Sequence, residues 1–350
     1  MEQLKVIGYL ILAVGLLMVA IKLLSKALDW FAARYMGLDR GPQRVIQIAF
    51  LLLILLWPVL MGSQVYLLRT SVMVLLYVTL ALSLNFILGF AGQLSMGHSA
   101  FFGIGAYITA LLTVNLGLNF WAAAALSAVG AAIFGFILGM PTLRLKGDYL
   151  AIATIGFGEI VRLVLINWVS LTRGPAGIPG IPSPKLFGYT LSSNTDYYYL
   201  LLALAAATIF IAHRLWHSRL GRGLIAVMDD EIAAEAMGVN CTVLKVMAFV
   251  LGAGVAGSVF ASFIHYVNPD NFTYMESVVI LCMVVLGGVG SLPGVILGAT
   301  VLTVLPEVLR DISTYRYAIY GLLLILMMII RPQGLISVAS VRRLKSGGKC

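Results

Sequence analysis

The feature of this sequence that most restricts its fold is a succession of long apolar runs along almost the whole chain. Of the 350 residues, 61% are hydrophobic and only 11% are charged. A soluble domain of this length cannot bury so much apolar surface, whereas a bilayer presents an apolar core of its own. The runs therefore predict an all-α integral membrane protein with about 10–11 transmembrane helices, some of them broken or re-entrant.

The positions of the spans follow from the length that a bilayer requires. A helix that crosses the membrane needs roughly 20 mostly apolar residues, and fewer where it is broken inside protein. The segments that meet this rule are 6–24, 45–61, 68–88, 97–115, 120–140, 149–169, 198–213, 245–266, 274–288, 292–306 and 317–331. The first run is too long for the apolar part of a signal peptide, so we interpret it as a retained span.

The direction of the spans follows from the charges of the loops. With the N-terminus outside and the C-terminus in the cytoplasm, the inner loops carry thirteen Lys and Arg residues and the outer segments carry five. Cytoplasmic loops are the ones enriched in these residues. This bias also explains the net charge of +9, and no nucleic-acid partner is expected. Residues 170–197 become the largest outer loop, which its prolines keep non-helical.

Two spans contain unusually many glycines, in segments of similar pattern at 88–94 and 286–292. Paired glycine-interrupted segments in two halves of a chain indicate a transport pathway, because glycine tolerates backbone that lines a wet cavity. The alternative is a stripe of small residues for close helix packing. Polar side chains accompany the first segment and favour a pathway there. The candidate pathway residues in the two segments are Gly92, Gln93, Ser95, Gly97, His98 and Gly290.

Another chemistry can be set aside for the first segment. Its glycines at 92 and 97 have the spacing of a phosphate-binding Walker A loop, but His98 stands where the lysine belongs. No strand precedes it, and spans flank it on both sides. Nucleotide binding by this chain is therefore not expected.

Two charged residues, Glu159 and Arg162, fall inside a predicted span and share one helix face. An unpaired charge at the bilayer centre costs at least ~2.5–3.5 kcal/mol, so they should face the bundle interior or each other. Glu159 is a further candidate pathway residue. A structural pair that locks two helices together is the alternative.

The long inner loop 214–244 predicts a short docking helix. Asp229 and Asp230 can cap a helix over 232–236, and Gly238 can end it. Its small, amphipathic face suits a groove on a partner protein. An ordinary surface helix is the alternative.

Several runs resemble a known family. The stretch 221–239 is similar to the coupling loop of ABC importer permeases. More specifically, the runs at 89–107 (GFAGQLSMGHSAFFGIGAY), 145–162 (LKGDYLAIATIGFGEIVR), 285–294 (VLGGVGSLPG) and 330–335 (IRPQGL) resemble the LivM-type permease of branched-chain amino acid importers. The resemblance covers about residues 45–336 in unbroken order.

The resemblance implies a channel subunit in a bacterial inner membrane. The expected partners are a homologous second permease, two cytoplasmic ATP-binding subunits, a periplasmic solute-binding protein and membrane lipid. The expected regions are an extra span and linker at 1–44, the permease domain at 45–336 and a cytoplasmic tail at 337–350. The residues expected to couple to the ATPase are Arg222, Asp229, Asp230, Glu231, Ala234 and Gly238.

Other functions remain to be weighed against this one. The same architecture serves importers of urea and short-chain amides. An ion-coupled carrier working alone would need charged relays in several spans, and the sequence offers mainly Glu159 and Arg162. A membrane enzyme would need a catalytic or metal constellation, but the four histidines lack ligand spacing and the three cysteines show no paired spacing. The chain is thus expected to hold no metal or cofactor and to leave ATP hydrolysis to its partners.

Overall fold

The computed structural model describes residues 40–62, 64–142, 145, 147–186, 188–252, 256–308, 316–331 and 334–336. The predicted first span at 6–24 and the predicted tail at 337–350 lie outside these residues. Nearly all ordered elements in the described part are helices, and the strands are only two residues long. The predicted all-α class is therefore confirmed.

Among the described residues, five stretches are long and apolar enough to cross a membrane, judged by length and composition. They comprise α3 (Val65–Asn85) with the π-helix η1 (Phe86–Phe90), α5 (Phe120–Thr142), α6 (Asp148–Asn167), α8 (Asn194–Trp216), and η3 (Pro269–Phe272) with α13 (Tyr274–Gly287). Further apolar helices are α2 (Arg40–Leu60), α4 (His98–Val114), α11 (Cys241–Gly252), α12 (Ala256–Ile264), α14 (Leu292–Val308) and α15 (Arg316–Ile330). Every predicted span from 45–61 onward coincides with one of these helices, except that 245–266 falls on both α11 and α12.

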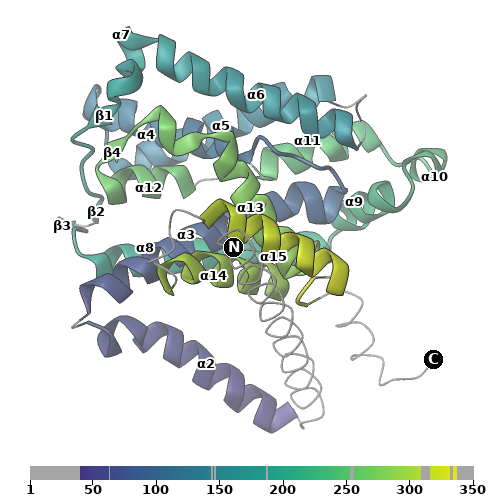
Figure 1. The fold of residues 1–350 in the computed structure, drawn as a ribbon, viewed down its shortest axis with the longest axis horizontal. Helices are drawn as coiled ribbons and strands as arrows, with labels where there is room; N and C mark the ends of the chain where they lie inside the picture. The colour runs from purple at the N-terminus through teal and green to yellow at the C-terminus, as the bar shows by residue number, and fades with distance from the viewer. Residues whose placement is uncertain are drawn as a thin grey trace, which may run out of the picture.

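The two long loops lie at opposite ends of the molecule. The loop predicted to be outside contains α7 (Val169–Thr172), η2 (Gly174–Ala176) and the strands β1 (Ile178–Pro179), β2 (Lys185–Leu186) and β3 (Tyr189–Thr190). β1 pairs with β4 (Tyr266–Val267) and β2 pairs with β3, both antiparallel. The loop predicted to be inside forms α9 (Arg219–Asp229) and α10 (Glu231–Ala236) at the other end (Figure 1). This separation is what the predicted topology requires.

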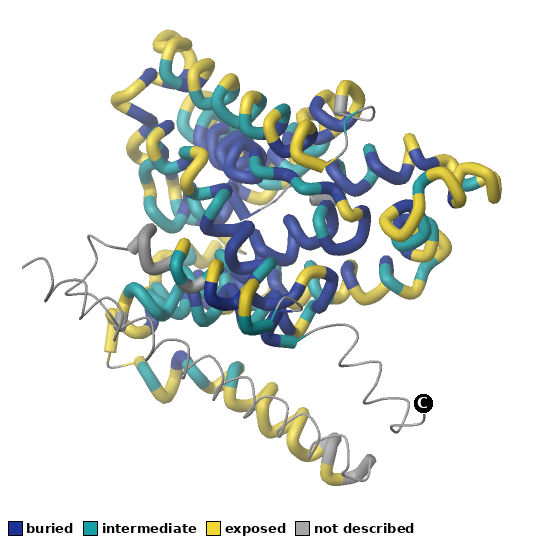
Figure 2. The backbone as a smooth tube through the Cα atoms, turned by 45° about the vertical axis from the view of Figure 1, so that its right-hand side comes forward, coloured by how far each residue is buried: buried dark blue, intermediate teal, exposed yellow. Residues whose placement is uncertain are grey.

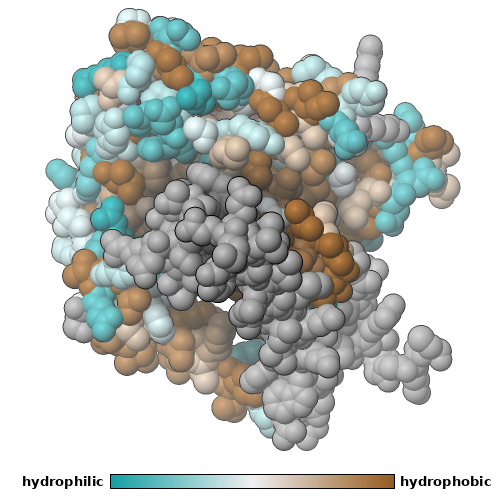
Figure 3. Space-filling view, viewed as in Figure 1, coloured by the Kyte–Doolittle hydropathy of each residue, from teal (hydrophilic) through white to brown (hydrophobic). Residues whose placement is uncertain are grey.

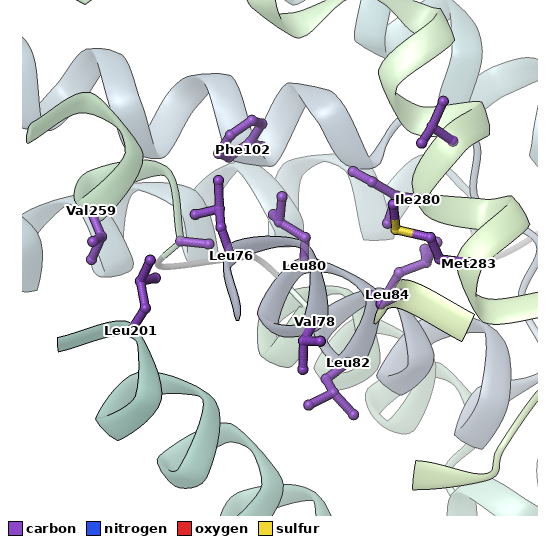
Figure 4. Close-up of a cluster of buried hydrophobic side chains, with 14 of the residues drawn as sticks. Leu76, Val78, Leu80, Leu82, Leu84, Phe102, Leu201, Val259, Ile280 and Met283 are labelled. Carbon is purple, nitrogen blue, oxygen red and sulfur yellow. The ribbon is translucent and has the colours of Figure 1, made fainter. Parts of the chain in front are cut away.

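The interior of the bundle is built around α3. Leu76, Leu80 and Leu84 are at most 2% exposed, and their side chains meet Phe102 of α4 and Met283 of α13 (Figure 4). A helix that is apolar on every side can be buried on every side, which explains why α3 is central. The other extreme is α2, which lies at the edge of the bundle with most of its apolar side chains exposed (Figure 2). Such a surface is suited to lipid or to another apolar helix.

Candidate functional site

Regular helical structure fails where the sequence predicts a break. α3 continues into the π-helix η1, residues 92–97 are not helical, and α4 begins at His98. π-helical turns occur often at functional sites. In the second glycine-rich segment, α13 ends at Gly287 and α14 begins at Leu292. The break predicted around the first glycine-rich segment is therefore present, at residues 92–97.

The two glycine-rich segments touch each other. The backbone amide of Gly290 donates a hydrogen bond of 2.9 Å to Oδ1 of Asn85, one turn before Gly89. A Cβ atom at Gly89 would lie only 2.6 Å from the amide nitrogen of Gly290. Gly287 and Gly294 also meet backbone to backbone, so a side chain on either would collide with the other. Close packing, the alternative left open for the second segment, thus accounts for Gly287 and Gly294, whereas Gly288 and Gly290 have positive φ values of +116° and +79°.

Neutral polar side chains gather around the first break, and we call them the interior polar cluster. Each is at most 6% exposed: Ser83, Gln93, Ser95, His98, Ser99 and Ser277. Nε2 of His98 lies 2.7 Å from Oγ of Ser83. The hydroxyl of Ser277 donates to Oγ of Ser99 at 2.7 Å and accepts from the Ser99 amide at 2.9 Å. The cluster ties the start of α4 to α3 and α13.

The interior polar cluster is not fully satisfied. Oε1 of Gln93, Oγ of Ser95 and Nδ1 of His98 are buried without a hydrogen-bond partner among the described residues. Nδ2 of neighbouring Asn85 is also buried without a hydrogen-bond partner among these residues. Each unsatisfied buried group costs about 1–3 kcal/mol, and native proteins contain few. Their concentration at one break distinguishes this place from an ordinary packed core.

The helix α6 lies directly against the break. The amide of Met96 donates to Oγ1 of Thr154 at 3.0 Å, and a methyl group at Gly97 would collide with the Thr154 carbonyl. One turn further along α6, a Cβ atom at Gly158 would lie 3.6 Å from Cα of Gly97. Glu159, predicted from the sequence as a pathway residue, therefore follows immediately after the contact between α6 and the break.

Three charged side chains, Glu159, Arg162 and Asp270, form what we call the surface charge cluster. Nη1 of Arg162 lies 3.0 Å from Oε1 of Glu159, and its Nη2 lies 2.9 Å from Oδ1 of Asp270 in η3. Their side chains are 45% (Glu159), 24% (Arg162) and 69% (Asp270) exposed. Glu159 and Arg162 do face each other, as expected, but at the surface of the chain.

The short helix predicted in the inner loop is present as α10. Oδ1 of Asp230 accepts hydrogen bonds from the amides of Ile232 and Ala233, which caps the helix. Gly238 follows the helix with a φ of +81°, a conformation that favours glycine. The predicted capping by Asp229 is wrong, because Asp229 is the last residue of the preceding helix α9.

Two contacts hold α10 on its neighbours, the helices α11 and α9. Nζ of Lys245, on α11, lies 2.5 Å from Oε1 of Glu231, and the Lys245 side chain is only 7% exposed. Ala234, the one buried residue of α10, packs into an apolar cluster with Leu224 and Val227 of α9. Arg222 remains at the surface and donates to the carbonyl of His217 at 3.2 Å.

The same apolar cluster includes Phe86 and Phe90 of the π-helix. The ring of Phe90 lies 5.1 Å from the ring of Trp216, just before α9, and a Cβ atom at Gly92 would lie 2.8 Å from Cγ of Met228. The outward side of α10, by contrast, presents Ile232 and Met237, which are 76% and 84% exposed. Hydrophilic residues surround this end of the molecule in Figure 3.

Sequence reasoning missed two charged residues. Asp270 was placed in a short outer loop, and the only signal was its position beside Pro269 at the start of a helical segment. Lys245 was read as the first residue of a span, although a lysine beside an acidic loop is a candidate for an ion pair. The ion pairs of Asp270 with Arg162 and of Lys245 with Glu231 depend on how separate segments of the chain approach each other. The periodicity of the sequence does not encode this approach.

Comparison with known proteins identifies the family. Residues 66–330 match the family described as "Branched-chain amino acid transport system / permease component". The chain belongs to this family. The match includes the break, α6, the surface charge cluster and α10, so the geometry above is that of a multi-pass membrane permease.

Individual relatives agree with the family match. The "High-affinity branched-chain amino acid transport system permease protein LivM" of Salmonella typhimurium is 40% identical over 332 residues, 87% of this chain and 78% of the relative. The LivM protein of Escherichia coli gives the same identity and coverage. The Escherichia coli LivH permease is 27% identical over 297 residues, 76% of this chain and 93% of the relative. No solved structure matches this chain.

Proposed function

We propose that this chain is a membrane-spanning subunit of an ATP-driven ABC importer for branched-chain amino acids. The names of its relatives support this substrate class over urea and short-chain amides. Relatives named LivM and LivH both match the chain, which is the result expected if two homologous permeases form one transporter. ATP hydrolysis belongs to two further cytoplasmic subunits, and a solute-binding protein delivers the amino acid.

The observation that carries the proposal is the link between α10 and the break. A docking helix is useful to an ATP-driven carrier only if its movement reaches the transport pathway. Here one apolar cluster contains Ala234 of α10, Leu224 of α9 and Phe90 of the π-helix. Interfaces of this kind change between discrete packings, so a displacement of α10 is transmitted to η1. The exposed side chains of Ile232 and Met237 fill a groove on the ATPase.

The break is the moving part of the pathway in this account. The buried atoms of Gln93, Ser95 and His98 that lack partners become hydrated when the chain changes state. Gly92 and Gly97 allow the backbone to bend there, and Gly290 holds the facing segment at close range. The neutral groups at the break bind a passing amino acid only weakly, so they do not slow its release.

The orientation belongs to the same proposal. The end of the molecule with α9 and α10 faces the cytoplasm, where the ATPase binds. The opposite end, with the strands β1 to β4, faces outward and receives the solute-binding protein. The N-terminus is outside and the C-terminus is in the cytoplasm, as the bias of basic residues requires.

Reconstitution tests the proposed function directly. The chain is co-expressed with a homologous second permease, ATPase subunits and a solute-binding protein from its own organism, and the complex is placed in lipid vesicles. We expect ATP-dependent uptake of leucine, isoleucine or valine, and no uptake without the binding protein. Uptake of urea or acetamide instead of these amino acids would contradict the substrate assignment.

A separate experiment tests α10. Ile232→Asp with Met237→Asp places charges on the docking surface while leaving the Asp230 cap and the Glu231–Lys245 pair intact. We expect the complex to lose substrate-stimulated ATPase activity although the chain still folds in the membrane. Glu235→Gln, at an exposed position on the same helix, is the matched control. Normal coupling in the Ile232→Asp, Met237→Asp variant would refute the role of α10.

A further inference from the structure

The surface charge cluster occupies an unusual position in the fold. Glu159 and Arg162 lie 11 and 14 residues after the start of the 20-residue helix α6, away from both of its ends. Asp270 belongs to η3, whose Phe272 packs against Phe102 and Tyr107 near the middle of α4. Glu159 and Arg162 therefore lie within one candidate membrane span, Asp148–Asn167, and Asp270 lies at the start of another, Pro269–Gly287.

Lipid cannot be the neighbour of these charges. Charged side chains within membrane spans almost always face a bundle interior or a water-filled cavity, because hydrocarbon does not solvate them. Yet Glu159 and Asp270 are 45% and 69% exposed on this chain. The side of α6 that carries the charges must therefore face water or protein in the assembled transporter. Since α6 also covers the break at Met96 and Gly97, this side is next to the segment that we propose to move.

The cluster has the composition of a site for a zwitterion. Two carboxylates share one guanidinium, so one negative charge is in excess. Both terminal nitrogens of Arg162 are paired and its Nε is buried, so a solute carboxylate binds by displacing Glu159 or Asp270. An arginine fork can accept a carboxylate in bidentate geometry. A carboxylate released from Arg162 is then available to an ammonium group.

We propose that Glu159, Arg162 and Asp270 form a transit site for the charged groups of the amino acid. The α-carboxylate binds to Arg162, and the α-ammonium binds to Glu159 or Asp270. When the solute binds, the site loses one ion pair between its own residues and gains two ion pairs with the solute. The charges of the solute therefore stay compensated during passage, and the solute is released easily. This inference rests on the proposed function, because urea and short-chain amides carry no such charges.

The test compares single and combined neutral variants in the reconstituted complex. Glu159→Gln, Arg162→Gln and Asp270→Asn should each lower ATP-dependent leucine uptake by about tenfold or more, because each removes one charged partner of the bound solute. The triple variant should transport no better. Assembly, measured by co-purification of the subunits, should stay at the wild-type level. Arg162→Lys keeps the charge but loses the fork and should give intermediate uptake, and Gly156→Ala on α6 is the matched control.

A structural lock predicts a different pattern. In that case the single variants are damaged by leftover unpaired charge, and the triple variant, which has none, recovers. Leucine uptake by the triple variant near the wild-type rate would overturn the proposal, and so would its failure to assemble. A wild-type complex that carries urea but not leucine would refute the proposed function itself, a result that is distinct from both.

Discussion

The interior polar cluster and the surface charge cluster lie on either side of the contact between α6 and the break. They differ in charge, in exposure and in whether their polar atoms are paired. The interior cluster is neutral and at most 6% exposed, and several of its atoms lack partners. The surface cluster is charged and between 24% and 69% exposed, and its ions are paired. Burial of charges is expensive, whereas burial of neutral groups is tolerable when most are hydrogen-bonded.

The difference indicates a division of work. Neutral groups inside the chain can hold a helix break in one state and release it in another at modest cost. Charges on the membrane face of a single chain are stable only where a second protein or water covers them. Substitutions in the interior cluster should therefore act first on stability, and substitutions in the surface cluster should act first on transport.

The largest effect on stability is expected for the buried ion pair between Lys245 and Glu231. It contrasts with the exposed ion pair between Arg162 and Asp270. Lys245→Ala removes the ion pair with Glu231 in a site where the lysine is 7% exposed. Removing one member of a buried pair costs about 3–5 kcal/mol. Thermal unfolding of the purified complex should show a markedly lower midpoint, and Glu231→Gln combined with Lys245→Met should recover much of it. A midpoint unchanged by Lys245→Ala would show that the pair is not a buried anchor.

The next effect concerns the contact between the two clusters. Gly97→Ala forces a methyl group onto the Thr154 carbonyl, and overpacking of this kind costs about 1–3 kcal/mol. We expect reduced stability and reduced transport together. Gly156→Ala adds the same methyl group to α6 where no atom lies within 4 Å, so it should be silent. Equal behaviour of the two variants would contradict the close approach of α6 to the break.

A smaller effect measures the interior cluster itself. Ser83→Ala and His98→Leu remove the two ends of one buried hydrogen bond. A double-mutant cycle should give a coupling energy of about 0.5–1.5 kcal/mol, the net value of such a bond. The free energies of unfolding of the four proteins supply the cycle. Strict additivity of the two changes in unfolding free energy would mean that the hydrogen bond contributes nothing to the stability of the interior polar cluster.

The smallest effect on stability is expected at the surface. Asp270→Asn removes one carboxylate that is 69% exposed from the ion pair with Arg162. Exposed pairs contribute about 0–1 kcal/mol, so the unfolding midpoint should hardly move while leucine uptake falls. A loss of stability as large as that of Lys245→Ala would erase the distinction between the two regions.

Local signals in the sequence were enough to predict some of these elements. The helix α10 has its capping aspartate and its terminal glycine within nine residues, so both its start and its end could be predicted. The broken segment at 89–99 was equally visible, because glycine and polar residues interrupt an apolar run there. Loop charge predicted which long loops lie at opposite ends of the molecule.

Contacts between distant segments could not be predicted in this way. Arg162 and Asp270 are 108 residues apart, and their pairing depends on η3 entering the bundle beside α4. The exposure of Glu159 is likewise a property of how α6 packs, which leaves one of its edges uncovered. The π-helix at Phe86–Phe90 has no sequence signature, since the same residues would continue an ordinary α-helix.

Cysteine accessibility in the assembled transporter tests the central claim, that the break opens to water during transport. Single cysteines at positions 93, 95 and 98, in a background with Cys241, Cys282 and Cys350 replaced, are treated with a water-soluble thiol reagent. The measurement is made with and without ATP in vesicles that contain the complete complex. We predict that at least Ser95→Cys and His98→Cys react in one nucleotide state and are protected in the other. No reaction at any of the three positions in either state would show that the interior polar cluster is structural, and the account would be wrong.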